Sequence, residues 1–314
     1  MNLINVEDVY HYTDVNGFIS IIQNKEFWLS HIRFMNDREE YLEGYGRCKS
    51  IIEKLKLGRE VHEINFLNKV MDKLNSEKSS GFFTRSSKDV FSLSLSTKRD
   101  SLDLWRGYGR NSGIAIGFDR QTSTDLVLIR KEDYESVKER HKSDSRKKTL
   151  PNSKLFVANN VIYEDDVKDK ILLSILEISL ERLNFLRDKK DETAEISAMT
   201  YATDVLFEII PYMKNKGFEN EAECRIVENS ISDTQKPIEI FYRERNGIIL
   251  PYIKYVLVDR NYKTLKNLPI KEIVVGPGLN QKDVIESVKY FLDKQGLEGL
   301  TEKVVGSKIP YIAN

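Results

Sequence analysis

VFSLSLS, residues 90–96, is the stretch that decides the fold, because its side chains alternate strictly between two kinds. The apolar set is Phe91, Leu93 and Leu95, and the serine set is Ser92, Ser94 and Ser96. A period of two residues predicts a β-strand with one face on a hydrophobic core. We expect the serine face to look toward solvent or a polar cleft.

A second strand is predicted at residues 113–118 (GIAIGF), where large apolar residues alternate with glycine and alanine. Its nearly bare face admits another backbone or a ligand at close range. Outward from these two stretches, further strands are predicted at Val9–Thr13, Glu26–Phe34, Val161–Tyr163, Glu221–Val227, Pro237–Tyr242, Tyr252–Val258, Lys271–Val275 and Lys303–Val305. Helices are predicted at Phe18–Ile22, Arg38–Lys56, Val167–Lys189, Thr193–Lys214 and Gln281–Gln295.

The order of these elements shows no regular alternation of strand and helix. This pattern indicates an α+β fold and argues against a doubly wound parallel sheet. We expect a single domain over residues 1–314, with a loop insertion at 120–160 and a helical insertion at 165–216. The loop includes a basic stretch at 138–148, for which a solvated loop and a nucleic-acid contact are both open.

Composition excludes several classes of protein. The 49 Lys and Arg residues balance 49 Asp and Glu, so the chain has no net positive charge that would attract nucleic acid over a long range. No segment approaches the roughly 18 consecutive apolar residues of a membrane span. The two cysteines, Cys48 and Cys224, have no metal-ligand spacing around them. We therefore expect a cytoplasmic protein with no metal and no membrane partner.

The most acidic candidate for chemistry is the segment Glu219–Val227 (ENEAECRIV). As a strand it projects Glu219, Glu221 and Glu223 from one face, where like charges repel. One interpretation is a solvated edge that Arg225 neutralises. The other is a carboxylate beside a cleft, able to bond a sugar hydroxyl or stabilise an oxocarbenium-like centre.

Two further motifs carry candidate ligand contacts. His11, in a strand rich in aromatic residues, is either a structural group or an imidazole that donates to a ribose hydroxyl. In the segment 105–109 (WRGYG), Trp105 and Tyr108 offer flat faces for a nicotinamide or a base, and core packing is the alternative. Candidate partners for a diphosphate are Arg33, Arg106 and Arg110.

Several segments, taken in their order along the chain, resemble the bacterial domain-of-unknown-function family 2971. They are His11-Tyr12-Thr13, Trp28-Leu29-Ser30 with Asn36-Asp37 and Glu40, Phe91–Ser94, Trp105–Gly109 with Gly113–Phe118, Lys216–Phe218 with Glu221–Arg225, and Ile273–Gly278. That family in turn resembles a distant branch of the ADP-ribosyltransferase fold. The resemblance implies a split, mainly antiparallel β-sheet with inserted central helices and a cleft for NAD.

The resemblance also implies roles for individual residues. It makes His11 a ribose contact, places a nicotinamide-supporting strand at Ser92 and Ser94, and makes Glu223 the residue that activates the nicotinamide ribose. The stacking ring stays open between Trp105, Tyr108 and Tyr12. The segment His11-Tyr12-Thr13 is similar to the start of DNA-targeting ADP-ribosyltransferase toxins, although no His-Gly pair follows on this strand.

The sequence thus predicts an NAD-dependent ADP-ribosyltransferase or NAD glycohydrolase, of a kind found among bacterial toxins and phage-defence effectors. Glu223 and His11 are the predicted catalytic residues, and NAD is the predicted substrate. The predicted NAD contacts are His11, Tyr12, Thr13, Arg33, Ser92, Ser94, Trp105, Arg106, Tyr108 and Glu221. The acceptor stays open between protein, DNA, RNA and water. Alternatives are a non-catalytic nucleotide or nucleic-acid binding module and an RNA phosphotransferase on the same fold.

Overall fold

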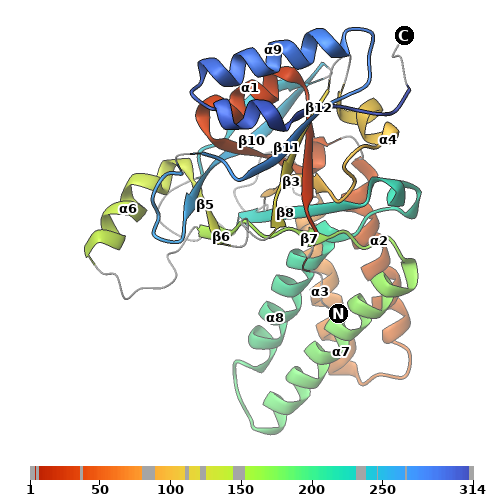
Figure 1. Ribbon diagram of the computed structural model, residues 1–314. Coiled ribbons are helices and arrows are strands. Elements are labelled where there is room, and N and C mark those ends of the chain that lie inside the picture. The colour runs from red at the N-terminus through yellow and green to blue at the C-terminus, as the bar shows by residue number, and fades with distance from the viewer. Residues whose placement is uncertain are drawn as a thin grey trace.

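A computed structural model describes residues 4, 7–35, 38–79, 89–109, 113–120, 125–143, 153–230, 238–245, 247–265 and 267–310. They form a mixed α/β structure around a large, mostly antiparallel sheet (Figure 1). The strands are β1 (Val9–Thr13), β2 (Glu26–His31), β3 (Asp89–Ser96), β4 (Ile114–Phe118), β5 (Leu126–Arg130), β6 (Ser153–Leu155), β7 (Asn159–Asn160), β8 (Glu223–Ser230), β9 (Phe241–Arg245), β10 (Ile248–Asp259), β11 (Ile270–Val275) and β12 (Val304–Gly306). The helices longer than two turns are α1 (Val15–Asn24), α2 (Arg38–Leu55), α3 (Val61–Ser79), α6 (Tyr134–Ser143), α7 (Asp165–Asp188), α8 (Ala194–Ile209) and α9 (Gln281–Lys294).

The sheet divides at β3, the strand of alternating serines. One edge of β3 pairs with β8 along its whole length. The other edge pairs with β2 only near Ser92 and with β1 only at Ser96. Since β1 and β2 diverge between these points, the sheet opens beside Ser94. The wing β12-β11-β4-β1 lies on one side of this opening and the wing β2-β10-β5-β6 on the other.

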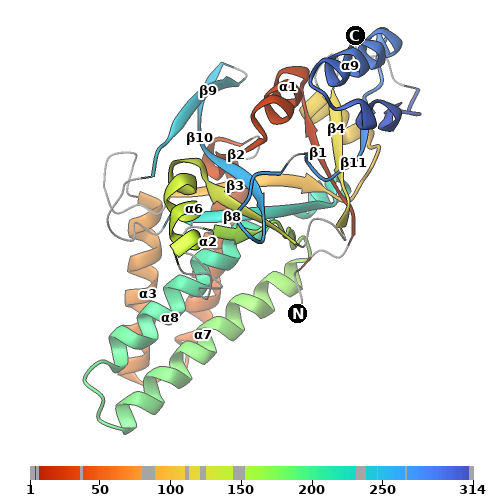
Figure 2. The same ribbon diagram turned by 60° about the vertical axis from the view of Figure 1, so that its left-hand side comes forward.

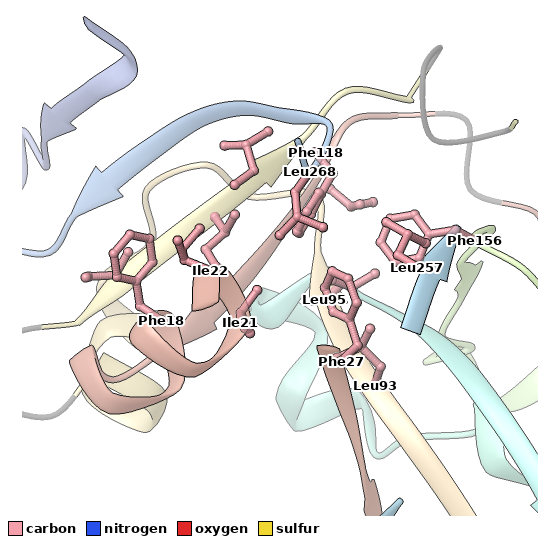
Figure 3. Packing of buried hydrophobic residues seen from close by; sticks show 14 of the residues in the cluster. Phe18, Ile21, Ile22, Phe27, Leu93, Leu95, Phe118, Phe156, Leu257 and Leu268 are labelled. Carbon is pink, nitrogen blue, oxygen red and sulfur yellow. The ribbon is translucent and has the colours of Figure 1, made fainter. Parts of the chain in front are cut away.

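The main hydrophobic core lies on the face of β3 that carries its leucines. Phe18, Ile21 and Ile22 of α1 belong to the same core, which Figure 3 shows. Helix α9 lies beside α1, where the rings of Phe18 and Phe291 are 5.9 Å apart. The predicted alternation of β3 therefore has the expected cause, since its apolar side chains are buried in this core.

Helices α2, α3, α7 and α8 form a bundle that projects away from the sheet (Figures 1 and 2). Their apolar stripes share a second core, which includes Ile52, Leu67, Leu176 and Leu206. The predicted helices at 167–189 and 193–214 correspond to α7 and α8. The bundle also takes in residues 38–79, which the predicted insertion at 165–216 leaves out.

The structure differs from the predicted loop insertion at 120–160. Strand β5 is paired along its length with β10, and Leu128 and Ile129 are fully buried. Strand β5 is buried on both faces, with Leu128 in the main core and Ile129 in a separate small cluster, so its residues (LVLIR) do not alternate and the sequence signal is weak. Of the basic stretch at 138–148, residues 144–148 lie outside the described part of the chain.

The bare face of β4 is filled by the protein itself rather than by a ligand. A side-chain carbon on Gly117 would come within 2.7 Å of the ring of Tyr10. The ring of Trp105 packs on Gly113 and Gly276 in the same way. These glycines therefore allow aromatic rings to lie directly on the backbone of the sheet.

Candidate functional site

The opening in the sheet holds a cavity of about 430 Å³, which is within the usual size range of small-molecule sites. Its walls come from β1, the start of α1, β2, β3, the turn before β8 and strand β9. Of the predicted site residues, those that line it are His11, Tyr12, Thr13, Ser92, Ser94, Arg106, Tyr108, Glu221 and Glu223. The fold thus brings together residues that lie more than 200 positions apart in the sequence.

Two predicted contacts do not line this cavity. Trp105 is 3% exposed, and its indole N–H donates to Asp100 at 2.7 Å. It packs edge-on against Tyr12, with 4.6 Å between ring centroids. Arg33 lies on the short helix after β2, outside the cavity wall. Trp105 is thus packed in the protein interior, and neither Trp105 nor Arg33 lines the cavity. Arg110 lies outside the described residues.

His11 sits in the opening itself. Its Nδ1 lies 3.0 Å from the carbonyl oxygen of Ser94, so Nδ1 carries the proton and donates. Burial, and behind it the nearby charges of Arg243 and Arg245, lower the pKa of this imidazole to about 4. At neutral pH the ring is uncharged, and Nε2 has an unshared electron pair. His11 is therefore built to accept a hydrogen bond at Nε2 rather than to donate one.

Glu223 begins β8 and is buried, in contrast to the solvated edge that one interpretation of this segment predicted. Arg225 holds its carboxylate with two hydrogen bonds, of 2.7 and 2.8 Å, and Lys214 adds a third of 2.9 Å. Burial opposes ionisation, but these two cations outweigh it and keep the pKa of Glu223 well below its usual range. Three of the four acceptor positions of the carboxylate are thus used, and one on Oε1 is left for a ligand.

The turn before β8 differs from the prediction of a strand starting at Glu221. Residues Lys216–Glu221 form a 3₁₀ helix, and Ala222 has a left-handed backbone (φ 41°, ψ 50°) that redirects the chain. Glu219 and Glu223 therefore do not share a strand face. Glu221 still lies close to Glu223, because both carboxylates bind Lys214. The hydroxyl of Ser96 fixes this turn by donating to the carbonyl of Glu221 at 2.7 Å.

The aromatic wall is formed by Tyr108 and Trp28. Of the three rings proposed for stacking, Trp105 is covered and Tyr12 is held by its hydroxyl, which donates to the carbonyl of Lys98 at 2.9 Å. Tyr108 lines the cavity, with the guanidinium of Arg245 5.6 Å from its ring centroid. Trp28 also lines it and stacks on Tyr252. The sequence argument had used Trp28 only as part of the family resemblance.

Strand β9 supplies a basic wall that the sequence argument missed. Arg243 and Arg245, two residues apart, both line the cavity, and Arg106 adds a third guanidinium. Arg243 donates to the hydroxyl of Ser30 at 2.9 Å, and no carboxylate of the described residues lies within ion-pair distance of it. The pattern Arg243-Glu244-Arg245 was visible in the sequence, since alternate arginines on a strand share a face.

Several buried polar atoms of this cavity have no hydrogen-bond partner in the described protein. They are Nε1 of Trp28, Nε of Arg243, and Oγ of Ser92 and Ser94. Buried polar groups are nearly always hydrogen-bonded, and an unmade bond costs about 1–3 kcal/mol. Atoms of this kind at one cavity are available to hydrogen-bond a polar molecule. The serine face of β3 thus looks into a polar cleft.

Among the described residues, no group of three or more His, Cys, Asp or Glu side chains has the geometry of a metal site. Cys48 and Cys224 are both buried thiols. No described helix combines the length and the apolar character that crossing a bilayer needs.

Comparison with known families gives one match. Residues 104–226 match a family described as "Protein of unknown function (DUF2971)". The match supports the resemblance to family 2971 over less than half of the chain, a stretch that includes Tyr108 and Glu223 but not His11. No curated protein and no solved structure matches the chain.

Proposed function

We propose that this cavity binds NAD and that the protein cleaves the bond between nicotinamide and ribose, as an ADP-ribosyltransferase or an NAD glycohydrolase. The observation that carries the proposal is the meeting of His11, Tyr108 and Glu223 at one cavity. An ionised carboxylate and a neutral imidazole can accept hydrogen bonds from ribose hydroxyls, and a flat ring can stack on nicotinamide. The matching family has no known function, so the match is no evidence for or against this reaction.

In the proposed reaction, Oε1 of Glu223 accepts a hydrogen bond from a hydroxyl of the nicotinamide ribose, and Nε2 of His11 accepts one from another ribose hydroxyl. The bond between the anomeric carbon and nicotinamide breaks, and its electron pair leaves with neutral nicotinamide. The positive charge then lies on the anomeric carbon and ring oxygen, near the Glu223 carboxylate. Water or an acceptor attacks this carbon and loses a proton to solvent.

The ion pairs of Glu223 serve this role, because they keep its carboxylate charged inside the protein. A neutral carboxylic acid would give much less stabilisation to the oxocarbenium-like state. Arg225 and Lys214 also fix the carboxylate in one orientation, through bonds to both of its oxygens. We therefore assign Arg225 and Lys214 as positioning residues for Glu223.

The test is release of free nicotinamide from NAD by the purified protein. We expect turnover by the wild-type protein and a loss of at least about 100-fold in Glu223→Gln, the size of effect seen when one preorganised electrostatic group is removed. Because Glu223→Gln also weakens two ion pairs, Glu223→Asp provides a second variant. It keeps the charge but withdraws the carboxylate by one methylene group, and we expect a similar loss of turnover, with thermal unfolding measured to show that the variant is folded.

The matched control is Glu177→Gln, a carboxylate on the exposed side of α7 in the helical bundle. This variant should release nicotinamide at the wild-type rate. Equal turnover by the wild type, Glu223→Gln and Glu223→Asp would remove Glu223 from the mechanism. Tight binding of NAD without release of nicotinamide by the wild type would favour a non-catalytic binding module instead.

A second candidate is favoured by one observation, the arginines at 106, 243 and 245 in the cavity wall. A basic cleft is what an RNA phosphotransferase needs to hold a terminal phosphate. The test is incubation with NAD, as the phosphate acceptor, and an RNA oligonucleotide that carries a labelled terminal phosphate. Loss of the label, abolished in Arg243→Gln, would support this function, and retention of the label in the wild type would exclude it for that substrate.

A further inference from the structure

We propose that Arg243 and Trp28 form the subsite that binds the diphosphate of a nucleotide ligand. The inference rests on the proposed function only for the identity of the ligand, since the subsite itself is argued from the protein. It gives the arginines of β9 a ligand group to bind. Arg33, the earlier candidate for this role, does not line the cavity, and the family resemblance names no residue of β9. The two side chains come from strands β2 and β9, which both pair with β10.

Arg243 differs from the other buried cations, because no carboxylate of the described residues pairs with it. Elsewhere in the described chain, the buried cations Lys168, Lys214 and Arg225 each contact a carboxylate at 2.7–2.9 Å. Arg243 has the hydroxyl of Ser30 and the faces of two rings instead. Burial lowers the pKa of Arg243 without a carboxylate to compensate. A guanidinium held in this way lacks the anion that buried cations otherwise have.

Two hydrogen-bond donors without partners also lie close together on Arg243 and Trp28. Nε of Arg243 and Nε1 of Trp28 are both buried and without a partner, and each can only donate. The guanidinium carbon of Arg243 lies 5.4 Å from the centroid of the Trp28 ring, so the two groups are neighbours. Donors without acceptors call for a ligand rich in acceptors. Phosphate oxygens fit, because a guanidinium matches their geometry with parallel hydrogen bonds.

A second arginine beside Arg243 favours a ligand with two phosphates. Arg245 follows Arg243 on the same face of β9 and also lines the cavity. The two guanidinium groups thus provide a cation for each phosphate. Tyr108, beneath Arg245, provides a flat face for the group attached next to the phosphates. In this arrangement the diphosphate lies along β9 while the nicotinamide ribose reaches His11 and Glu223.

Trp28 on β2 and Arg243 on β9 are both held in place by Tyr252 of β10. Trp28 stacks on Tyr252 with 4.6 Å between centroids and an angle of 30° between the rings. The guanidinium of Arg243 also lies 5.5 Å from the centroid of Tyr252. These contacts fix the positions of both donors before a ligand arrives, so little conformational entropy is lost on binding.

The experiment is titration calorimetry of the full chain with ADP-ribose, inorganic pyrophosphate and adenosine. Arg243→Gln should weaken ADP-ribose binding by about 10-fold to 100-fold, the equivalent of losing charged hydrogen bonds. Trp28→Phe, which keeps a ring and removes the N–H, should weaken it by several-fold. Adenosine, which has no phosphate, should bind both variants as it binds the wild type. Arg182→Gln, in the helical bundle, is the matched control and should bind ADP-ribose normally.

The outcomes separate this proposal from the proposed function. Pyrophosphate binding that is lost in Arg243→Gln, together with no nicotinamide release from NAD, supports the subsite and removes the NAD reaction. Nicotinamide release with ADP-ribose affinity unchanged in Arg243→Gln and Trp28→Phe overturns the subsite and leaves the reaction standing. A wild type that binds neither ADP-ribose nor pyrophosphate overturns the subsite. Binding of 5′-phosphorylated RNA in place of ADP-ribose overturns the assignment to a small nucleotide.

Thermal unfolding of each variant guards against a trivial loss of binding. Arg243→Lys is the second variant, because it keeps the positive charge and loses the guanidinium geometry. We expect it to fall between the wild type and Arg243→Gln in affinity for ADP-ribose. Wild-type affinity in both Arg243→Lys and Arg243→Gln, with all proteins folded, would contradict the subsite.

Discussion

The two ends of the cavity treat arginine in opposite ways. At one end Arg225 is 1% exposed and bonded to both oxygens of Glu223 and to the carbonyl of Pro211. At the other end Arg243 is largely buried but has a serine hydroxyl as its hydrogen-bond partner and two aromatic rings around it. The first arrangement is complete within the protein. In our proposal the second becomes complete when the diphosphate of the ligand binds.

The largest expected effect on stability is at the end of the cavity where Arg225 is paired with Glu223. Arg225→Met should lower the free energy of unfolding by about 3–5 kcal/mol, because it leaves the buried Glu223 carboxylate with one of its two cations. Urea unfolding monitored by circular dichroism measures this change. A loss below about 1 kcal/mol would mean that Arg225 does not hold the carboxylate as the structure indicates.

The next effect is a pH dependence at His11. Its pKa is lowered to about 4 in the folded protein, below the usual value of about 6.5. Between these values the unfolded chain binds a proton that the folded protein does not, so stability falls as the pH drops from 6.5 to 4. The slope from this residue is at most about 1.4 kcal/mol per pH unit.

His11→Gln should remove that slope, and His62→Gln, on helix α3 of the bundle and away from the cavity, serves as the control. Urea unfolding at several pH values measures both. An unchanged slope in His11→Gln would show that the imidazole is not held neutral.

At the other end of the cavity, a substitution of Arg243 should change the stability of the protein only slightly. Arg243→Met removes one hydrogen bond and two ring contacts, but it also removes a buried charge without a carboxylate. We expect the free energy of unfolding to change by no more than about 1 kcal/mol in either direction. The same urea experiment as for Arg225→Met provides the comparison. A loss as large as that of Arg225→Met would mean that Arg243 is structural and that the contrast between the two ends is false.

The smallest effect concerns the turn that places Glu223. Ala222 has a left-handed backbone (φ 41°), which costs an alanine about 1–2 kcal/mol and a glycine almost nothing. Ala222→Gly also makes the unfolded chain more flexible, so a net gain of about 0.5 kcal/mol is expected. Thermal unfolding measures it. A clear loss of stability would show that the methyl group of Ala222 packs more favourably than its backbone is strained.

Much of the fold was predictable because its signals are local. The alternation at 90–96 predicts β3 and its two faces, the strand at 9–13 has the predicted bounds, and β4 begins one residue after the predicted start at 113. Helical periodicity likewise placed α7 and α8 to within a few residues, except at the end of α8. The segment 120–160 was not predictable in this way, since β5 is buried on both faces and shows no alternation.

The site was predictable to the extent that its residues lie in recognisable motifs. His11 and Glu223 were found by their residue type and order, but their partners depend on tertiary contacts. Arg243 meets Trp28 only because β9 and β2 both pair with β10. Trp105 has the same ring as Trp28, and nothing in its local sequence says that it is buried beneath the site. Burial of this kind is decided by the packed structure and not by propensity.

The most direct test of the account is a crystal structure of the wild-type protein with carba-NAD, an analogue whose nicotinamide bond is not cleaved. The account predicts the diphosphate beside Arg243 and Trp28, the nicotinamide ribose within hydrogen-bond distance of Oε1 of Glu223 and Nε2 of His11, and the Glu223–Arg225 pair intact. A ligand bound elsewhere, or bound here with its phosphates away from Arg243 and its nicotinamide ribose away from Glu223, would contradict it.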